Sequence, residues 1–86
     1  MLYGGLRKKP ILGLSLDDKK NIKVSGRGTK TLVQMGLNLG LALREACLAV
    51  GGQGGGHRIA AGATVPPEKL DEFLKIFVSV VEKQIG

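Results

Sequence analysis

The 86-residue chain has very little of the material from which several common kinds of site are built. Its one cysteine, Cys47, cannot form an internal disulfide, and one cysteine with one histidine does not make a zinc-ligand set. Only 3% of the residues are aromatic, so the chain lacks the stacking platforms that most single-strand binders use. These absences exclude a disulfide scaffold and a zinc module, and they favour a reducing, cytoplasmic compartment.

A long apolar run is also missing. The first twenty residues contain several basic side chains and no apolar stretch of membrane length, so we expect neither a signal peptide nor a membrane span. The hydrophobic content of 43% is typical of a globular protein, and 86 residues are enough for one hydrophobic core but not for two. We therefore expect residues 1–86 to form a single soluble domain.

Acidic residues are scarce in most of the chain. Residues 1–65 contain ten Lys or Arg against three Asp or Glu, a net charge of +7, whereas residues 66–86 contain three against four, a net charge of −1. A positive field on a small surface favours anionic partners, above all phosphates. General solubility is the other explanation of this charge.

Apolar periodicity predicts an N-terminal hairpin followed by a less regular segment. Leucines alternate along residues 10–16, a polar break follows, and Ile22 and Val24 alternate in the next stretch, as in two antiparallel strands. The segment 29–38 indicates one short helical turn and a loop.

Two helices and a strand are predicted in the rest of the chain. Apolar residues at helical spacing run from a good N-cap, Asn38, to a fitting stop, Gly51. Residues 59–65 form a short strand, and Pro67 begins a final helix that reaches Ile85. The expected fold is α/β of the α+β kind, a small mixed sheet with the hairpin near its N-terminus and two main helices packed on it.

The glycine run at residues 54–56 lies between the first of these helices and the strand. Consecutive glycines can adopt positive φ angles and expose several backbone N–H groups, which predicts a loop with a concave cluster of donors for an anion. His57 adds a side chain that can become charged near neutral pH. Arg58 is expected to point the other way, because neighbouring side chains in a strand alternate.

Other glycine motifs fit less well. The Walker A pattern is absent, the Rossmann fingerprint needs a strand before the glycines and a helix after them, and the G-x-x-G loop of a KH domain joins two helices. The alternative without a ligand is a tight helix-to-strand turn in which His57 is an ordinary polar residue.

Two motifs resemble a known family. The sequence VGGQGGGHRIAAGA at residues 50–63 resembles the G-G-G-H and A-A-G motif of the DHHA1 domain, the C-terminal module of DHH-family phosphoesterases such as RecJ-like exonucleases and oligoribonucleases. KVSGRG at residues 23–28 resembles the second signature of that family, S-x-R. The resemblance covers residues 11–82 and implies a set of substrate phosphate ligands: Ser25, Arg27, Gly54, Gly55, Gly56 and His57.

The resemblance implies the substrate-holding part of a two-domain enzyme. The D-H-H sequence and a D-x-D pattern are missing, so we expect no catalytic residue, cofactor or metal on this chain, and a divalent Mn or Mg ion on a separate DHH domain. That domain is one expected partner, in cis or in trans. The others are single-stranded nucleic acid, an oligonucleotide or a nucleoside monophosphate, with no membrane.

Two alternatives stay open at this point. Alanyl-tRNA synthetases also carry a DHHA1-like terminus, but the His57 motif followed by IAAGA is more similar to the phosphoesterase branch. The chain could instead be a protein-interaction module that forms a homodimer through its helices, with a glycine loop that only turns the chain.

Overall fold

The computed structural model describes residues 11–86 and begins with the predicted hairpin. Strand β1 (Ile11–Leu16) pairs antiparallel with β2 (Ile22–Arg27). The Asp17 carboxylate fixes the turn between them, because its Oδ1 accepts hydrogen bonds from the amides of Lys19 at 2.8 Å and Asn21 at 2.9 Å. The first ten residues of the expected single domain lie outside the described residues.

Two helices with side-chain caps follow the hairpin. Thr29 caps the short helix α1 (Lys30–Gln34), which is the helical turn expected in this segment. Asn38 caps α2 (Leu39–Val50) by accepting a hydrogen bond from the Leu41 amide, and Gly51 ends it with a φ of +78°. The predicted bounds of α2 are therefore confirmed.

The sheet is completed by β3 (Gln53–Gly56) and β4 (Ala60–Val65), in the order β1-β2-β4-β3. The α+β fold is confirmed, but all three strand pairings are antiparallel and the sheet is not mixed. A short turn at residues 57–59 joins β3 to β4, and a turn this short can join only antiparallel strands.

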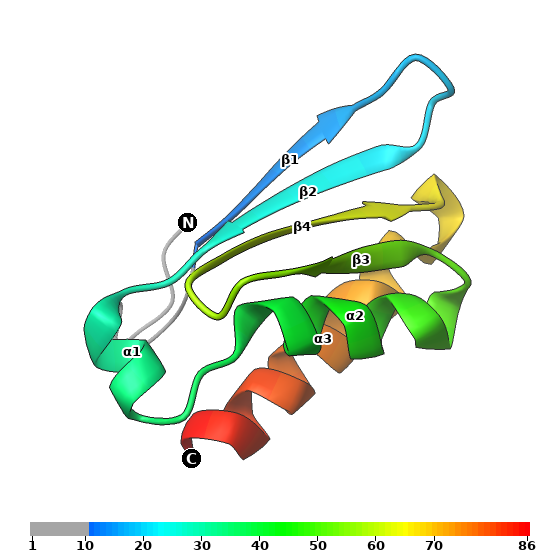
Figure 1. The fold of residues 1–86 in the computed structure, drawn as a ribbon. Coiled ribbons are helices and arrows are strands. Elements are labelled where there is room, and N and C mark those ends of the chain that lie inside the picture. Colours follow the sequence, from blue (N-terminus) through cyan, green and yellow to red (C-terminus); the bar gives the residue numbers. More distant parts are fainter. Residues whose placement is uncertain (1–10) are drawn as a thin grey trace.

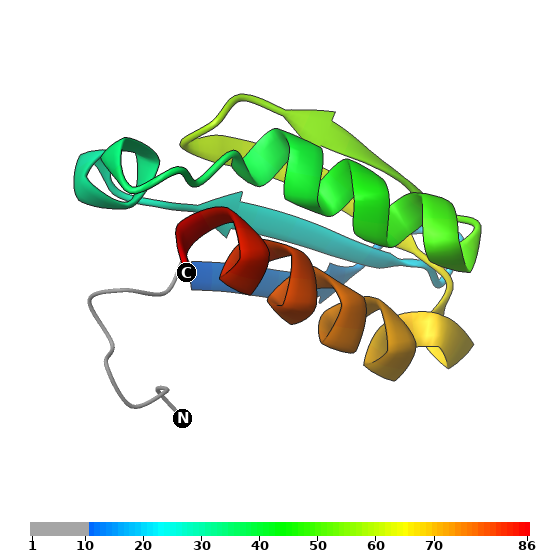
Figure 2. The ribbon, with the colours of Figure 1, turned by 90° about the horizontal axis from the view of Figure 1, so that it is seen from below.

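Helix α3 (Leu70–Ile85) follows a 3₁₀ turn at Pro67–Lys69 and completes the core. Helices α2 and α3 lie side by side on one face of the sheet (Figures 1 and 2). Phe73, Phe77 and Val81 of α3 are buried against the apolar face of α2, as their spacing predicts. None of the helices within residues 11–86 is long and apolar enough to cross a membrane.

The side of the sheet away from the helices is open. Val24 of β2 and Ala63 and Val65 of β4 are buried on the helix side, so their neighbours along each strand point to the other side. Lys23, Ser25 and Arg27 are accordingly exposed. This side of the four strands, away from α2 and α3, is the open face of the sheet.

Candidate functional site

Three of the predicted ligands share the open face. Ser25 and Arg27 lie there on β2, and Arg27 is the register partner of Ala60 on β4. The His57 amide donates a hydrogen bond to the Ala60 carbonyl oxygen at 2.8 Å, which makes His57 and Ala60 opposite one another across the β3–β4 turn. Residues opposite one another in an antiparallel pair point to the same face. Arg27 and His57 therefore project from one face on either side of Ala60.

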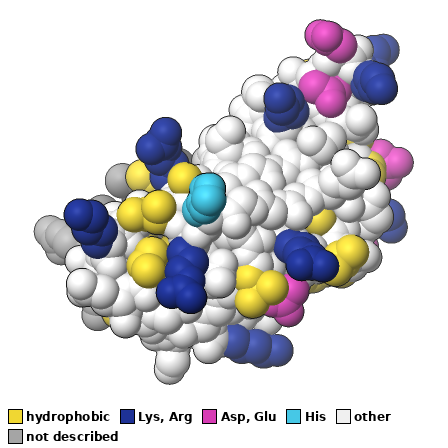
Figure 3. All heavy atoms as spheres, in the orientation of Figure 1, with side chains coloured by type: hydrophobic (Ala, Val, Ile, Leu, Met, Phe, Trp, Pro, Cys, Tyr) yellow, Lys and Arg dark blue, Asp and Glu magenta, His cyan; other side chains and the backbone are white. Residues whose placement is uncertain are grey.

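The surface between these side chains is nearly bare. Ser25 is the register partner of Gly62, and Gly62 is in turn the partner of Gly55, so one row across the sheet carries two glycines beside one serine. A Cβ added at Gly55 would meet no atom within 4 Å. Figure 3 shows this area as white surface, with the histidine in cyan and Lys or Arg side chains in dark blue near it. A ligand can therefore approach the sheet backbone closely.

The prediction that the glycine run at residues 54–56 forms a loop is wrong. Residues 53–56 form strand β3, whose register pairs Gly54 with Ala63, Gly55 with Gly62 and Gly56 with Ala61. Because the His57 amide points to β4, alternation along the strand directs the Gly55 amide to β4 as well. The glycine amides consequently do not converge as one free concave cluster. Phosphate binding by Gly54, Gly55 and Gly56 stays a prediction.

Close helix packing explains two of the glycines. A Cβ on Gly54 would lie 2.9 Å from the Sγ of Cys47, and a Cβ on Gly40 of α2 would overlap the backbone of Gly56. Neither position has room for a Cβ atom, so α2 can lie this close to β3 only because Gly40 and Gly54 have no side chain.

The amides at the start of α2 hold the turn between β3 and β4. The Leu39 amide donates to the Arg58 carbonyl at 2.9 Å, and the Gly40 amide donates to the His57 carbonyl at 3.0 Å. On the other side of the turn, the Gly28 amide donates to the Ile59 carbonyl at 2.8 Å. These bonds fix the backbone that carries His57 and Arg58.

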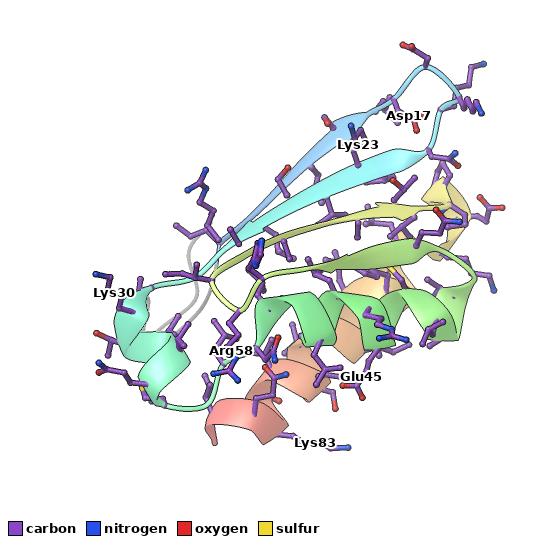
Figure 4. All side chains as sticks on the ribbon, in the orientation of Figure 1. Asp17, Lys23, Lys30, Glu45, Arg58 and Lys83 are labelled. Atoms are coloured by element: carbon purple, nitrogen blue, oxygen red, sulfur yellow. The ribbon has the colours of Figure 1, made fainter. Side chains whose placement is uncertain are left out.

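An open groove adjoins His57. It has a volume of about 610 Å³ and lies between α1 and the β3–β4 turn, lined by Lys30, Val33, Gln34, His57, Arg58 and Ile59. In Figure 4, Lys30 projects from α1 and Arg58 from the turn. The sequence analysis did not identify Lys30 or Gln34. The available signal was the position of a basic residue directly after the Thr29 cap, shortly beyond the S-x-R motif.

The charge of this region is positive and uncompensated. Within residues 11–86, no carboxylate forms an ion pair with Arg27, Lys30 or Arg58; a pair at 4.0 Å joins Lys69 and Glu72 elsewhere in the fold. Exposed cations without carboxylate partners are available to an anionic ligand. The open face and the groove therefore present exposed positive charge of the kind that suits an anionic ligand.

Metal chemistry and thiol chemistry do not fit the described residues. No group of three His, Cys, Asp or Glu side chains suited to a metal ion is formed within residues 11–86. Burial raises the pKa of the Cys47 thiol, so the thiol is protonated and packed in the core at neutral pH.

Comparisons with known proteins cover nearly the whole chain. A family model described as the DHHA1 domain matches residues 4–83. An uncharacterized protein of Methanocaldococcus jannaschii is 40% identical over 77 residues, which cover 90% of this chain and 17% of that protein. Alanine–tRNA ligases of Thermoanaerobacter sp. strain X514 and Thermoanaerobacter pseudethanolicus are each 36% identical over 86 residues, which cover 99% of this chain and 10% of the ligase. The chain thus spans less than a fifth of the length of these relatives.

Proposed function

The chain belongs to the DHHA1 domain family, and from this premise we propose that it is an accessory domain that holds the phosphate backbone of a nucleic-acid strand or nucleotide. The observation that carries the proposal is the position of Ser25, Arg27 and His57 on one open face around a floor without large side chains. A guanidinium is a good phosphate donor because it adds charge to the hydrogen bond, and the histidine ring supplies a further N–H donor.

Each predicted ligand has a part in this proposal. Arg27 and His57 bind the phosphate oxygens from two sides, and Ser25 donates its hydroxyl or orients Arg27. Gly55 lets the phosphate lie close to the sheet, and Gly54 acts indirectly by allowing the close packing of α2 that holds the turn. Gly56 also acts indirectly, because a Cβ at this position would lie 2.7 Å from Ala61 of β4.

The groove beside His57 would receive the next part of the ligand. Val33 and Ile59 offer apolar contact to a sugar or base, Gln34 offers an amide, and Lys30 and Arg58 offer charge to a neighbouring phosphate. Among residues 11–86, the open face and the groove carry no Phe, Tyr or Trp, so binding would depend mainly on the phosphates and the affinity would depend strongly on salt.

More specifically, we propose that this accessory domain is the substrate-holding domain of a RecJ-like DHH phosphoesterase or exonuclease in the cytoplasm. Its support is the pair of motifs S-x-R and G-G-G-H, of which Ser25, Arg27, Gly55 and His57 lie on the open face. The catalytic Mn or Mg ion would be held by a DHH domain, in cis or in trans, and this chain would contribute only substrate binding.

A second candidate is the corresponding accessory domain of an alanine–tRNA ligase. It is favoured by the 36% identity to two such ligases over 99% of the chain. In that case the ligand would be tRNA. The two candidates differ in whether a short single strand or a folded tRNA binds better.

A titration tests the proposal. A fluorescently labelled single-stranded oligonucleotide and a labelled tRNA are each titrated with the full chain at several salt concentrations. If about two phosphates are engaged, the slope of log K against log salt for the single strand is about −1.4. Affinity that does not change with salt would contradict phosphate binding. Stronger binding of tRNA at equal salt would favour the ligase-like candidate.

A further inference from the structure

Strand β1 has a free edge. The strand order places β1 at one side of the sheet with β2 as its neighbour, and no strand within residues 11–86 pairs with its other side. Its sequence, ILGLSL, contains no charged residue and no proline. Charged residues and proline are the usual means by which proteins protect an edge strand, so this edge is open to another strand.

The free edge presents the backbone of particular residues. The Asp17 amide donates to the Asn21 carbonyl at 2.9 Å, so in this hairpin the odd-numbered residues of β1 bond to β2. Alternation in an antiparallel ladder then turns the amides and carbonyls of Leu12, Leu14 and Leu16 outward. These three residues have donors and acceptors ready for a new partner strand.

The same leucines also form an apolar row, which is partly buried against the core at Leu12 and uncovered at Leu14 and Leu16. Their side chains lie on the helix side of the sheet, yet Leu14 is 48% exposed and Leu16 is 68% exposed. Figure 1 shows the β1–β2 hairpin extending away from the helices, which explains why α3 does not cover this row. A partner that pairs with the edge would therefore also cover apolar side chains.

We propose that β1 is a self-association edge, at which a second copy of this chain pairs antiparallel with Leu14 opposite Leu14 of the partner. This register sets Leu12 opposite the partner's Leu16, and each of the three leucines both donates and accepts a backbone hydrogen bond. The leucine rows of the two copies meet on one face. If the second copy is shifted along the edge by two residues or more in either direction, at least one of these leucines has no leucine opposite it.

The symmetry of this register identifies the partner. A strand that pairs with itself about one residue forms a closed two-fold interface, in which the same surface is used by both copies. The ILGLSL strand satisfies this condition with its three leucines matched to one another and with Gly13 opposite Ser15 on the other face. A second copy of the chain therefore meets both the hydrogen-bonding and the apolar requirements of the edge.

The pairing would have a consequence for the rest of the molecule. The two-fold axis at Leu14 is perpendicular to the sheet, because opposed residues in antiparallel strands share a face. The open faces of both copies would therefore lie on the same side of one continuous eight-stranded sheet, formed from two four-stranded sheets. This inference does not depend on what the open face binds.

Light scattering of the full chain over a wide dilution series tests the proposal. We expect a mass that changes from one copy to two as the concentration rises. Leu16→Lys should raise the dimer dissociation constant by about tenfold or more, because it places a charge in the leucine row of each copy. The matched control is Leu48→Lys on α2, since Leu48 is 70% exposed and Leu16 is 68% exposed. Circular dichroism confirms that both variants are folded.

A cross-link tests the register without weakening the edge. Leu14→Cys should form a disulfide dimer on mild oxidation, because directly opposed residues of a hydrogen-bonded pair have Cα atoms about 5.5 Å apart. Leu48→Cys should not, and the buried Cys47 should stay reduced in both. A chain that is monomeric at every concentration, a dimer that is lost in Leu48→Lys and kept in Leu16→Lys, or a dimer without the Leu14→Cys disulfide would overturn the proposal.

Discussion

Arg27 and His57 stand on either side of Ala60 on the open face of the sheet. Arg27 is the register partner of Ala60, and the His57 amide donates to the carbonyl oxygen of the same residue. Two strand spacings separate them, about 10 Å between Cα atoms, and the alanine between them adds little bulk. The two side chains therefore have a common space above the sheet in which a phosphate could be held.

Removal of Arg27 should weaken binding of a single-stranded oligonucleotide. Because the guanidinium is exposed and screened by solvent, we expect Arg27→Ala to lower the affinity by about tenfold at low salt and to make the salt dependence shallower. Fluorescence anisotropy measures both effects. The matched control is Arg44→Ala, which removes an exposed arginine from α2 on the other side of the sheet. An equal loss in both variants would mean that only net charge matters.

Removal of His57 should also weaken binding of a single-stranded oligonucleotide. The ring adds a hydrogen-bond donor to the open face on the other side of Ala60 from Arg27, so we expect His57→Ala to lower the affinity by about threefold to tenfold. His57→Gln keeps a polar side chain with a donor, and its affinity should lie between those of the original chain and His57→Ala. Equal affinity in the original chain and His57→Ala would argue against this part of the site.

The helix positions and the hairpin could be predicted from sequence because local signals agree with the fold. Asn38 caps the start of α2 and Gly51 ends it, as their residue types predict. The apolar residues of segment 70–85 have helical spacing, and they lie on the face that α3 buries. The role of residues 53–56 could not be predicted, because glycine has a low strand propensity. Only pairing with β4 and the close approach of α2 make this segment a strand.

The candidate site was predictable to a similar extent. Strand alternation, together with the family motifs, placed Ser25 and Arg27 on β2. The expectation that Arg58 points away from His57 assumed a strand that begins at His57, whereas both residues lie in the turn before β4 and line the same groove. The groove was missed because α1 is a five-residue helix whose position depends on its packing against the rest of the fold. No periodic signal in so short a segment indicates that Lys30 and Gln34 lie near His57.

Gly40→Ala should destabilise the protein, although alanine is normally the better helix residue by about 1 kcal/mol. The new Cβ would overlap the backbone of Gly56, so α2 would have to move away from β3. We expect the free energy of unfolding to fall by about 1–3 kcal/mol in urea denaturation. Gly13→Ala is the control, since the nearest atom to its Cβ would be 3.9 Å away. A variant as stable as the original chain would show that the helix and the strand are not in such close contact.

Cys47 should make stability depend on pH in the alkaline range. Burial raises the pKa of its thiol in the folded state, so folding is favoured while the thiol is protonated. This contribution is fully present below the unfolded-state pKa of about 8.5, and it is lost as the pH rises through the higher folded-state pKa. The difference in unfolding free energy between the original chain and Cys47→Ala should therefore shrink with rising pH. A difference that stays constant would mean that the thiol ionises as easily in the fold as in water.

The central claim is that Arg27 and His57 hold the same phosphate across Ala60, and a double-mutant cycle tests it most directly. Affinities for a single-stranded oligonucleotide are measured for the original chain, Arg27→Ala, His57→Ala and the double variant under the same buffer and salt conditions. Two residues that share one phosphate should show a coupling energy of at least about 0.5 kcal/mol, so the double variant loses less than the two single losses together. Strictly additive losses, or no loss in either single variant, would contradict the claim.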